Sequence, residues 1–159
     1  MKLRVSLPDQ TLSLIDGAGQ VLKVYPVSTA ASGAGEERNS HCTPRGRHIV
    51  RAKIGAGLPP GSVFVARRPT GEIYTPALGL AQPGRDWILT RILWLSGREP
   101  GYNRLGSCDT MRRYIYIHGT PDESFEQAPR SHGCIRMRNR DLIELFDRVP
   151  VYTQVEVIA

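Results

Sequence analysis

Residues 131–137 read Ser-His-Gly-Cys-Ile-Arg-Met, and the rest of the chain is organised around this stretch. Cys134 is a candidate nucleophile, but a cysteine reacts as a thiolate and therefore needs a base or a positive environment nearby. His132 lies two residues before it, and His118 lies sixteen residues before it, in the segment Tyr116-Ile117-His118-Gly119-Thr120. Gly133 lets the backbone approach a substrate and direct amide groups at it. The pattern indicates thiol chemistry.

Other interpretations of these residues are open. Most free cysteines are small buried hydrophobes, and a histidine at the end of a strand can simply bond a neighbouring carbonyl. A metal site made of His118, His132 and Cys134 is a third interpretation, but no Cys-x-x-Cys or His-Glu-x-x-His spacing supports it. The pair His41 and Cys42 lacks two further ligands at sensible spacing. We therefore expect neither a metal ion nor a cofactor.

The composition is that of one globular domain spanning residues 1–159. Of these residues, 40% are hydrophobic and 23% are charged, which is typical of a folded chain rather than a disordered one. The net charge of +6 favours anionic partners, but the arginines are scattered and no nucleic-acid-binding motif accompanies them. No apolar stretch is long enough to span a bilayer. A solvated basic surface is the simplest interpretation, and we expect neither nucleic acid nor membrane as a partner.

Two features favour a cytoplasmic protein. The N-terminus alternates polar and apolar residues and shows no export signal, although a trimmed chain would look the same. The three cysteines, Cys42, Cys108 and Cys134, have no regular spacing, which is typical of a reducing compartment.

Alternating residues predict short strands throughout the chain, at residues 2–7, 11–15, 21–27, 48–50, 63–65, 71–74, 113–118 and 151–158. The apolar run 86–95, which contains Trp94, predicts a central strand. Segments rich in turn-forming or polar residues predict loops at 28–46, 76–84 and 96–110. The opening meander favours an antiparallel sheet.

Parity in the strand predicted at 113–118 places Tyr114, Tyr116 and His118 on one face. Ile115 and Ile117 lie on the other face, which we expect to be the core side. His118 would then stand at the end of the strand, facing the loop that carries Cys134.

One helix is predicted after the cysteine. Asn139 is its expected N-cap, and Pro150 is expected to end it. The apolar positions follow helical spacing, at Leu142, Leu145, Phe146 and Val149. The predicted fold class is mainly β, a sandwich or barrel with one packed helix.

The two motifs together resemble those of the L,D-transpeptidase (YkuD/ErfK) family, with Thr43-Pro44-Arg45-Gly46 similar to a further family element. The resemblance covers most of the chain and implies a YkuD-like fold. It implies Cys134 as nucleophile, His118 as base oriented by the carbonyl of Gly119, and His132 as a residue that shapes the site. The amides of Gly133 and Cys134 are the expected oxyanion donors.

The same resemblance implies a substrate-binding region. Arg136 would meet a substrate carboxylate, which suits its forked guanidinium, although a plain surface arginine is the alternative. Ser131 would brace the loop. Tyr116 and Trp94 are the remaining candidates, since the central strand borders the cleft in the family.

Family members act on the tetrapeptide stems of peptidoglycan and release the terminal D-alanine through an acyl-thioenzyme. The resemblance is greatest to the leaderless members that trim recycled muropeptides, so we expect water as the acceptor, which is L,D-carboxypeptidase activity. The alternatives are 3→3 cross-linking or D-amino-acid exchange, and a non-catalytic domain that binds the cell wall. The motif does not fix the oligomeric state.

Overall fold

The computed structural model describes residues 1–159 and confirms the mainly-β prediction. The chain begins with a three-strand meander, formed by β1 (Lys2–Ser6), β2 (Thr11–Ile15) and β3 (Val21–Ser28). The remaining strands are β4 (Gly46–Ile54), β5 (Ser62–Val65), β6 (Arg68–Ile73), β7 (Ile88–Gly97), β8 (Tyr116–Gly119), β9 (Ile135–Met137) and β10 (Gln154–Ile158). The α-helices are α1 (Pro76–Ala81) and α2 (Asn139–Arg148).

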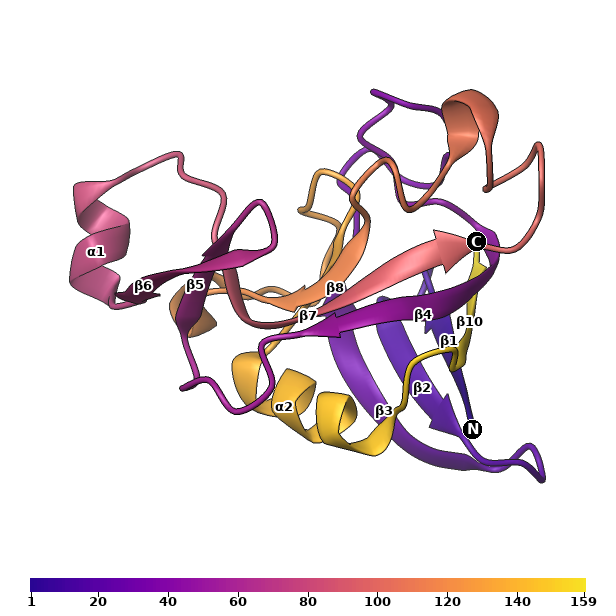
Figure 1. Ribbon diagram of the computed structural model, residues 1–159, viewed down its shortest axis with the longest axis horizontal. Helices are drawn as coiled ribbons and strands as arrows, with labels where there is room; N and C mark the ends of the chain where they lie inside the picture. Colours follow the sequence, from indigo (N-terminus) through magenta and orange to yellow (C-terminus); the bar gives the residue numbers. More distant parts are fainter.

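The strands form one sheet that closes on itself (Figure 1). Its order is β4-β10-β1-β2-β3-β9-β8-β7-β5-β6, and β4 also pairs with β7, so that the part from β4 to β7 is a ring. The meander is antiparallel, as predicted. The sheet as a whole is mixed, because β1 pairs with β10 in parallel and β8 pairs with β9 in parallel. Ring closure leaves few free strand edges.

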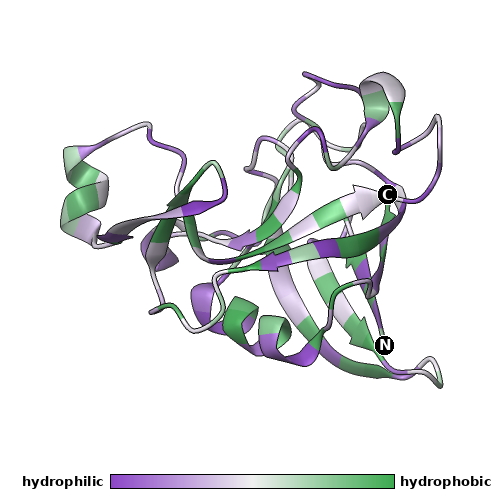
Figure 2. Ribbon diagram, viewed as in Figure 1, coloured by the Kyte–Doolittle hydropathy of each residue, from purple (hydrophilic) through white to green (hydrophobic).

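The core fills the space between the ring and α2. Green alternates with pale colours along β2 in Figure 2, and buried residues alternate with less buried ones along β1 and β2, as expected for strands with one buried face. Leu142, Leu145 and Phe146 of α2 are buried against this core, together with Ile115 and Ile117 as predicted. Each such side chain stabilises the fold by about 1.5–3 kcal/mol relative to its exposed state.

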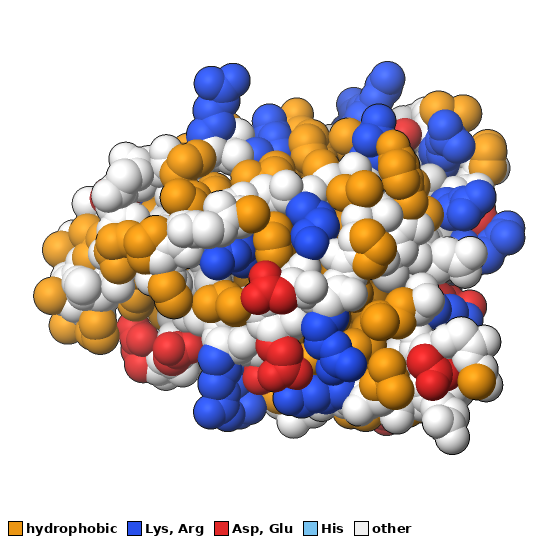
Figure 3. Space-filling view, turned by 60° about the horizontal axis from the view of Figure 1, so that its bottom comes forward, with side chains coloured by type: hydrophobic (Ala, Val, Ile, Leu, Met, Phe, Trp, Pro, Cys, Tyr) orange, Lys and Arg blue, Asp and Glu red, His pale blue; other side chains and the backbone are white.

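The segment β5–β6–α1 projects from the ring as an arm, at the left of Figure 1. On the face shown in Figure 3, hydrophobic side chains gather at this end, while Lys and Arg are interspersed with Asp and Glu elsewhere. Val65, Ile73 and Leu80 of the arm are exposed. Neither α-helix has the length and apolarity that crossing a bilayer would require.

The loop predicted at 76–84 is wrong, because residues 76–81 form α1. Thr75 is its N-cap and accepts a hydrogen bond from the amide of Leu78, while Pro76 occupies the first turn. Both are sequence signals for a helix start. They were outweighed by the glycine and proline content of the segment.

Two further predictions need correction. The strand predicted at 113–118 begins only at Tyr116, because Tyr114 has a left-handed φ of 58° and breaks the extended backbone. Asn139 is not the N-cap of α2. The cap position is Arg138, and Asn139 is the first helical residue, whose side chain bonds to other segments instead.

Candidate active site

Two adjacent parallel strands bring the predicted nucleophile and base together. Strands β8 and β9 pair in a register that places Ile117 beside Ile135, and Cys134 directly precedes β9. The isoleucines point into the core, so that His118 and Cys134 face the opposite side. There they border one cavity of about 200 Å³, lined by Asp86, Ile88, Tyr114, His118, Ser131, His132, Cys134 and Arg136.

Cys134 is held as a thiol by two backbone groups. Its Sγ accepts a hydrogen bond from the amide of Tyr116 at 3.3 Å and donates to the carbonyl of Tyr114 at 3.4 Å. Burial raises the pKa of the thiol to about 12, although the Tyr116 amide and the charges of Arg136 and Arg113 act in the opposite direction. The thiol is therefore protonated at neutral pH, and it would need a base to remove its proton before it could act as a nucleophile.

His118 has the form that such a base requires. Its side chain is 1% exposed, and Nδ1 lies 2.6 Å from the carbonyl oxygen of Gly119, which can only accept. The proton is therefore on Nδ1, and the lone pair is on Nε2. Burial lowers the pKa of His118 below its ordinary value, and Arg136 acts in the same direction, whereas the Gly119 carbonyl and Asp86 oppose them. The ring is neutral at physiological pH and able to take a proton.

A strained bulge in β7 fixes the strand that carries His118. The pairing of β7 with β8 shifts between Leu89 and Ile92, which lie opposite Gly119 and His118. Thr90, within this bulge, is fully buried and has a φ of 77°, a rare conformation for a β-branched residue. Gly119 fits here because a Cβ would come within 2.6 Å of the carbonyl oxygen of Leu89. Strain of this kind persists where the surrounding structure holds it.

Asn139 ties the bulge to the His118 segment, a role that the sequence did not reveal. Its Oδ1 accepts a hydrogen bond from Thr90 Oγ1 at 2.5 Å, and its Nδ2 donates to the carbonyl of Thr120 at 2.9 Å. The first residue of α2 thus links β7 to the end of β8. The sequence signal was an asparagine at the start of a helix, which is usually a cap.

The loop before Cys134 is braced from inside. Ser131 Oγ donates to the carbonyl of Cys134 at 2.5 Å and accepts from the amide of Gly133 at 3.2 Å. Gly133 has a φ of 128°, which favours glycine, and its carbonyl accepts from Thr43 Oγ1 at 2.9 Å. Since the Gly133 amide already has an acceptor, its predicted role as an oxyanion donor does not fit this arrangement. The amide of Cys134 has no acceptor within the chain and is the donor available.

Arg136 borders the cavity and is half-buried, but it does not stand alone. Its Nη2 lies 3.7 Å from Oδ1 of Asp86, a residue that sequence analysis did not single out. Asp86 is more exposed than Arg136, with 60% of its side chain accessible against 22%. Asp86 therefore orients the guanidinium of Arg136, which could bind a carboxylate placed in the cavity.

His132 occupies a different position from His118. Its side chain is exposed, and its ring lies edge-on to His41, with ring centroids 6.0 Å apart. It lines the Cys134 cavity and also a neighbouring one. No group of three or more His, Cys, Asp or Glu side chains is placed to hold a metal ion.

Tyr116 and Trp94 do not line the cavity, contrary to the prediction. Tyr116 is 4% exposed, its hydroxyl accepts a hydrogen bond from Arg67 at 3.0 Å, and its backbone amide donates to the sulfur of Cys134. Trp94 packs edge-on against Tyr116 and donates through Nε1 to the carbonyl of Met111. The guanidinium of Arg67 lies over the ring of Trp94. These aromatic residues pack behind the sulfur and do not line the cavity.

Comparison with known proteins places this geometry in one family. A family model described as YkuD, L,D-transpeptidase catalytic domain, matches residues 2–157. Among curated proteins, the Probable L,D-transpeptidase ErfK/SrfK of Salmonella typhimurium is 36% identical over 112 residues, covering 62% of this chain and 36% of that protein. The Probable L,D-transpeptidase YbiS of Escherichia coli K12 is 49% identical over 47 residues, which are 29% of this chain and 15% of that protein. The matched stretches thus span well under two thirds of these relatives.

Solved structures share the fold at low sequence identity. An L,D-transpeptidase from Mycobacterium smegmatis has a TM-score of 0.55 and 21% identity, covering 99% of this chain and 58% of that one. L,D-transpeptidase 3 from Mycobacterium tuberculosis, in complex with a faropenem-derived adduct, has a TM-score of 0.58 and 16% identity, covering 99% of this chain and 59% of that one. Sequence identities of 21% and 16% show only that the fold is shared. Membership of the family rests on the family model, which matches residues 2–157.

Proposed function

This chain belongs to the YkuD family of L,D-transpeptidase catalytic domains, and on that premise we propose that it cleaves the peptide stem of peptidoglycan through an acyl-thioenzyme on Cys134. The observation that carries the proposal is the shared cavity of Cys134 and His118, in which His118 Nδ1 is bonded to the Gly119 carbonyl and Nε2 is left as the base. The substrate would be a tetrapeptide stem that ends in D-alanine.

The reaction begins with proton transfer. Nε2 of His118 takes the proton of the Cys134 thiol as the sulfur attacks the carbonyl carbon of the diamino acid. The Cys134 amide donates to the developing oxyanion, and losing such a donor typically costs about 3–4 kcal/mol in the barrier. His118 then returns the proton to the nitrogen of the leaving D-alanine, which breaks the peptide bond and leaves a thioester.

The acceptor decides the outcome. We propose water, which would give a tripeptide and place the enzyme in the recycling of muropeptides on the cytoplasmic side. This choice keeps the expectation from the family resemblance, since the motif and the fold are common to both routes. The names of the curated relatives, which are probable L,D-transpeptidases, favour an amine acceptor as the alternative. Both routes share the acylation steps.

Product masses distinguish the two acceptors. Purified protein is incubated with a muropeptide tetrapeptide, with and without a second stem as amine donor. A tripeptide as the main product supports hydrolysis, whereas cross-linked dimers as the main product would replace it with transpeptidation. Cell fractionation tests the proposed location separately.

Covalent labelling tests the nucleophile. L,D-transpeptidases have been solved with imipenem and with a faropenem-derived adduct, so we expect a carbapenem to add one equivalent of mass to this protein. Cys134→Ala should abolish the mass gain, whereas Cys42→Ala is the matched control and should retain it. The same mass gain in Cys134→Ala would show that another residue carries the adduct.

A further inference from the structure

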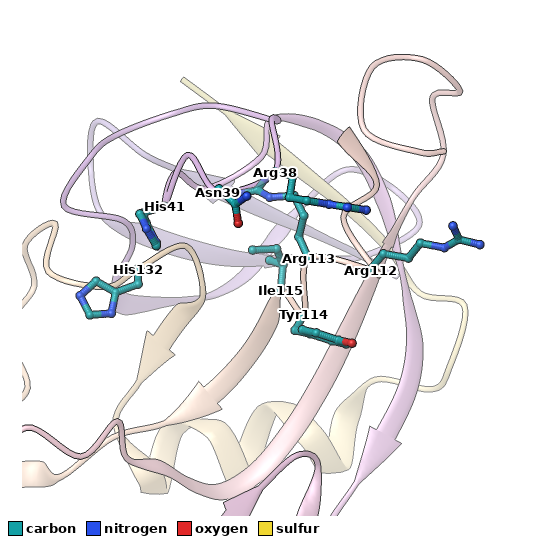
Figure 4. Close-up of a pocket in the computed structure, with 8 residues that line it drawn as sticks. All are labelled: Arg38, Asn39, His41, Arg112, Arg113, Tyr114, Ile115 and His132. Carbon is teal, nitrogen blue, oxygen red and sulfur yellow. The ribbon is translucent and has the colours of Figure 1, made fainter. Parts of the chain in front are cut away.

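A second cavity of about 330 Å³ adjoins the one at Cys134 (Figure 4). The two share Tyr114 and His132, and the carbonyl of Tyr114 touches the sulfur. A ligand that is bound at the sulfur and extends past Tyr114 therefore enters the second cavity. We call it the basic cavity, and its lining residues are Arg38, Asn39, His41, Arg112, Arg113, Tyr114, Ile115 and His132.

Positive charge predominates in the lining of the basic cavity. None of its lining residues is acidic, and neither Arg38 nor Arg112 lies in an ion pair. The two acidic residues of the adjoining loop are engaged elsewhere: Glu36 pairs with Arg45, and Glu37 accepts a hydrogen bond from the hydroxyl of Ser107. In Figure 4 the two histidines lie at one side, and the guanidinium ends of Arg38 and Arg112 lie at the other.

The third arginine builds the wall of the basic cavity. Arg113 is half-buried and donates hydrogen bonds to the carbonyls of Gly35 and Cys42 and to the hydroxyl of Ser40. It thereby fixes the turn that presents residues 38–41. The amide of Arg38 bonds the carbonyl of Ser107 at 2.8 Å, which anchors the same turn to a second segment. The walls are therefore set before any ligand arrives, which reduces the entropy lost on binding.

We propose that the basic cavity is a carboxylate subsite, in which Arg38 and Arg112 hold a free carboxylate of the peptide whose reacting carbonyl lies at Cys134. This inference rests on the proposed function, since it names the part of the same substrate that the cavity recognises. Guanidinium groups bind carboxylates through paired hydrogen bonds, and here two of them lack an internal partner. The peptide would carry one carboxylate towards Arg136 and another towards this cavity, with Cys134 between them.

Binding to Cys134→Ala protein tests the subsite without turnover. The ligand is a tetrapeptide stem, compared with versions in which one carboxylate at a time is amidated, and affinity is measured by NMR titration. Arg38→Ala/Arg112→Ala should weaken binding of the free peptide by roughly tenfold. The double substitution should also abolish the difference in affinity between the free peptide and the version in which the recognised carboxylate is amidated. Arg98→Ala, an exposed arginine outside both cavities, is the matched control.

The outcomes separate the two proposals. If no stem peptide binds to the Cys134→Ala protein at all, the proposed function fails. If the peptide binds but the arginine double variant binds it as well as the control does, the carboxylate subsite alone is overturned. Arg38→Lys/Arg112→Lys, which keeps the charge, should restore part of the affinity. A folded double variant is verified by an unchanged amide spectrum away from the cavity.

Discussion

Two histidines flank the same cysteine, and the structure gives them opposite environments. His118 is 1% exposed, with one ring nitrogen bonded to the Gly119 carbonyl and its strand fixed by the Thr90–Asn139 contact. His132 is exposed and touches no fixed partner except the edge of His41. A base needs a fixed tautomer and a defined direction, whereas a residue at the mouth of a cavity needs neither. The comparison predicts that their substitutions have very different effects.

The largest effect is expected at His118. His118→Gln keeps a polar side chain of similar reach but removes the base, so we expect kcat for the tetrapeptide to fall by about 10²–10⁴. The measurement is the rate of D-alanine release under saturating substrate. A decrease of less than threefold would assign the base to another residue and would remove the main difference between the two histidines.

The pH profile is the next test. His118 must be neutral to act, and its pKa lies below the 6.5 of an ordinary histidine. Activity should therefore be level above pH 6.5 and should fall, by up to about tenfold per pH unit, only on the acid side of that value. An inflection well above pH 6.5 would contradict a buried neutral base.

The free energy of unfolding should also fall on the acid side of pH 6.5. The pKa of buried His48 is lowered to about 4, mainly by burial, and that of His118 is lowered as well. A group whose folded pKa is depressed binds its proton more readily in the unfolded chain. The stability that these rings contribute is thus complete above pH 6.5 and is lost as the pH falls below it. Denaturant unfolding at several pH values measures this loss, and His48→Gln should reduce its size.

Asn139→Ala tests what fixes His118. The change leaves the Thr90 hydroxyl and the Thr120 carbonyl without their partner, and should lower the free energy of unfolding by about 1–3 kcal/mol. Activity should fall more than this loss of folded protein explains, because the strand end that bears His118 is released. Gln20→Ala, which shortens an exposed amide side chain outside both cavities, is the matched control. Equal activities of the two folded variants would show that the Asn139 contact does not position the base.

The smallest effect is expected at His132. Exposed substitutions usually change stability by less than about 0.5 kcal/mol. His132→Asn should therefore leave the protein folded. Because the residue borders both cavities and has no fixed hydrogen-bond partner, we expect kcat to change by less than about threefold and any larger change to appear in KM. A loss as large as that of His118→Gln would give His132 a direct part in proton transfer.

The sequence by itself determined the family, the mainly-β class, the helix after the cysteine and the core isoleucines. Alternation, helical spacing and a short motif are local, so they can be read along the chain. The motifs also predicted five of the residues that line the cavity, which are His118, Ser131, His132, Cys134 and Arg136, and tertiary structure alone decided the others. Tyr116 and Trp94 lie behind the sulfur because β7 packs against β8, whereas Asp86, Asn139 and Arg38 reach the site from separate segments.

The different environments of the two histidines have the same origin. In the sequence, both histidines precede a glycine, and only the family resemblance distinguished the expected base, His118, from His132. Burial depends on which strands lie side by side, and the pairing of β8 with β9 and of the β7 bulge with β8 encloses His118 but not His132. Burial and hydrogen bonds in turn set the pKa and the tautomer, so only the assembled ring decides which histidine can act as the base.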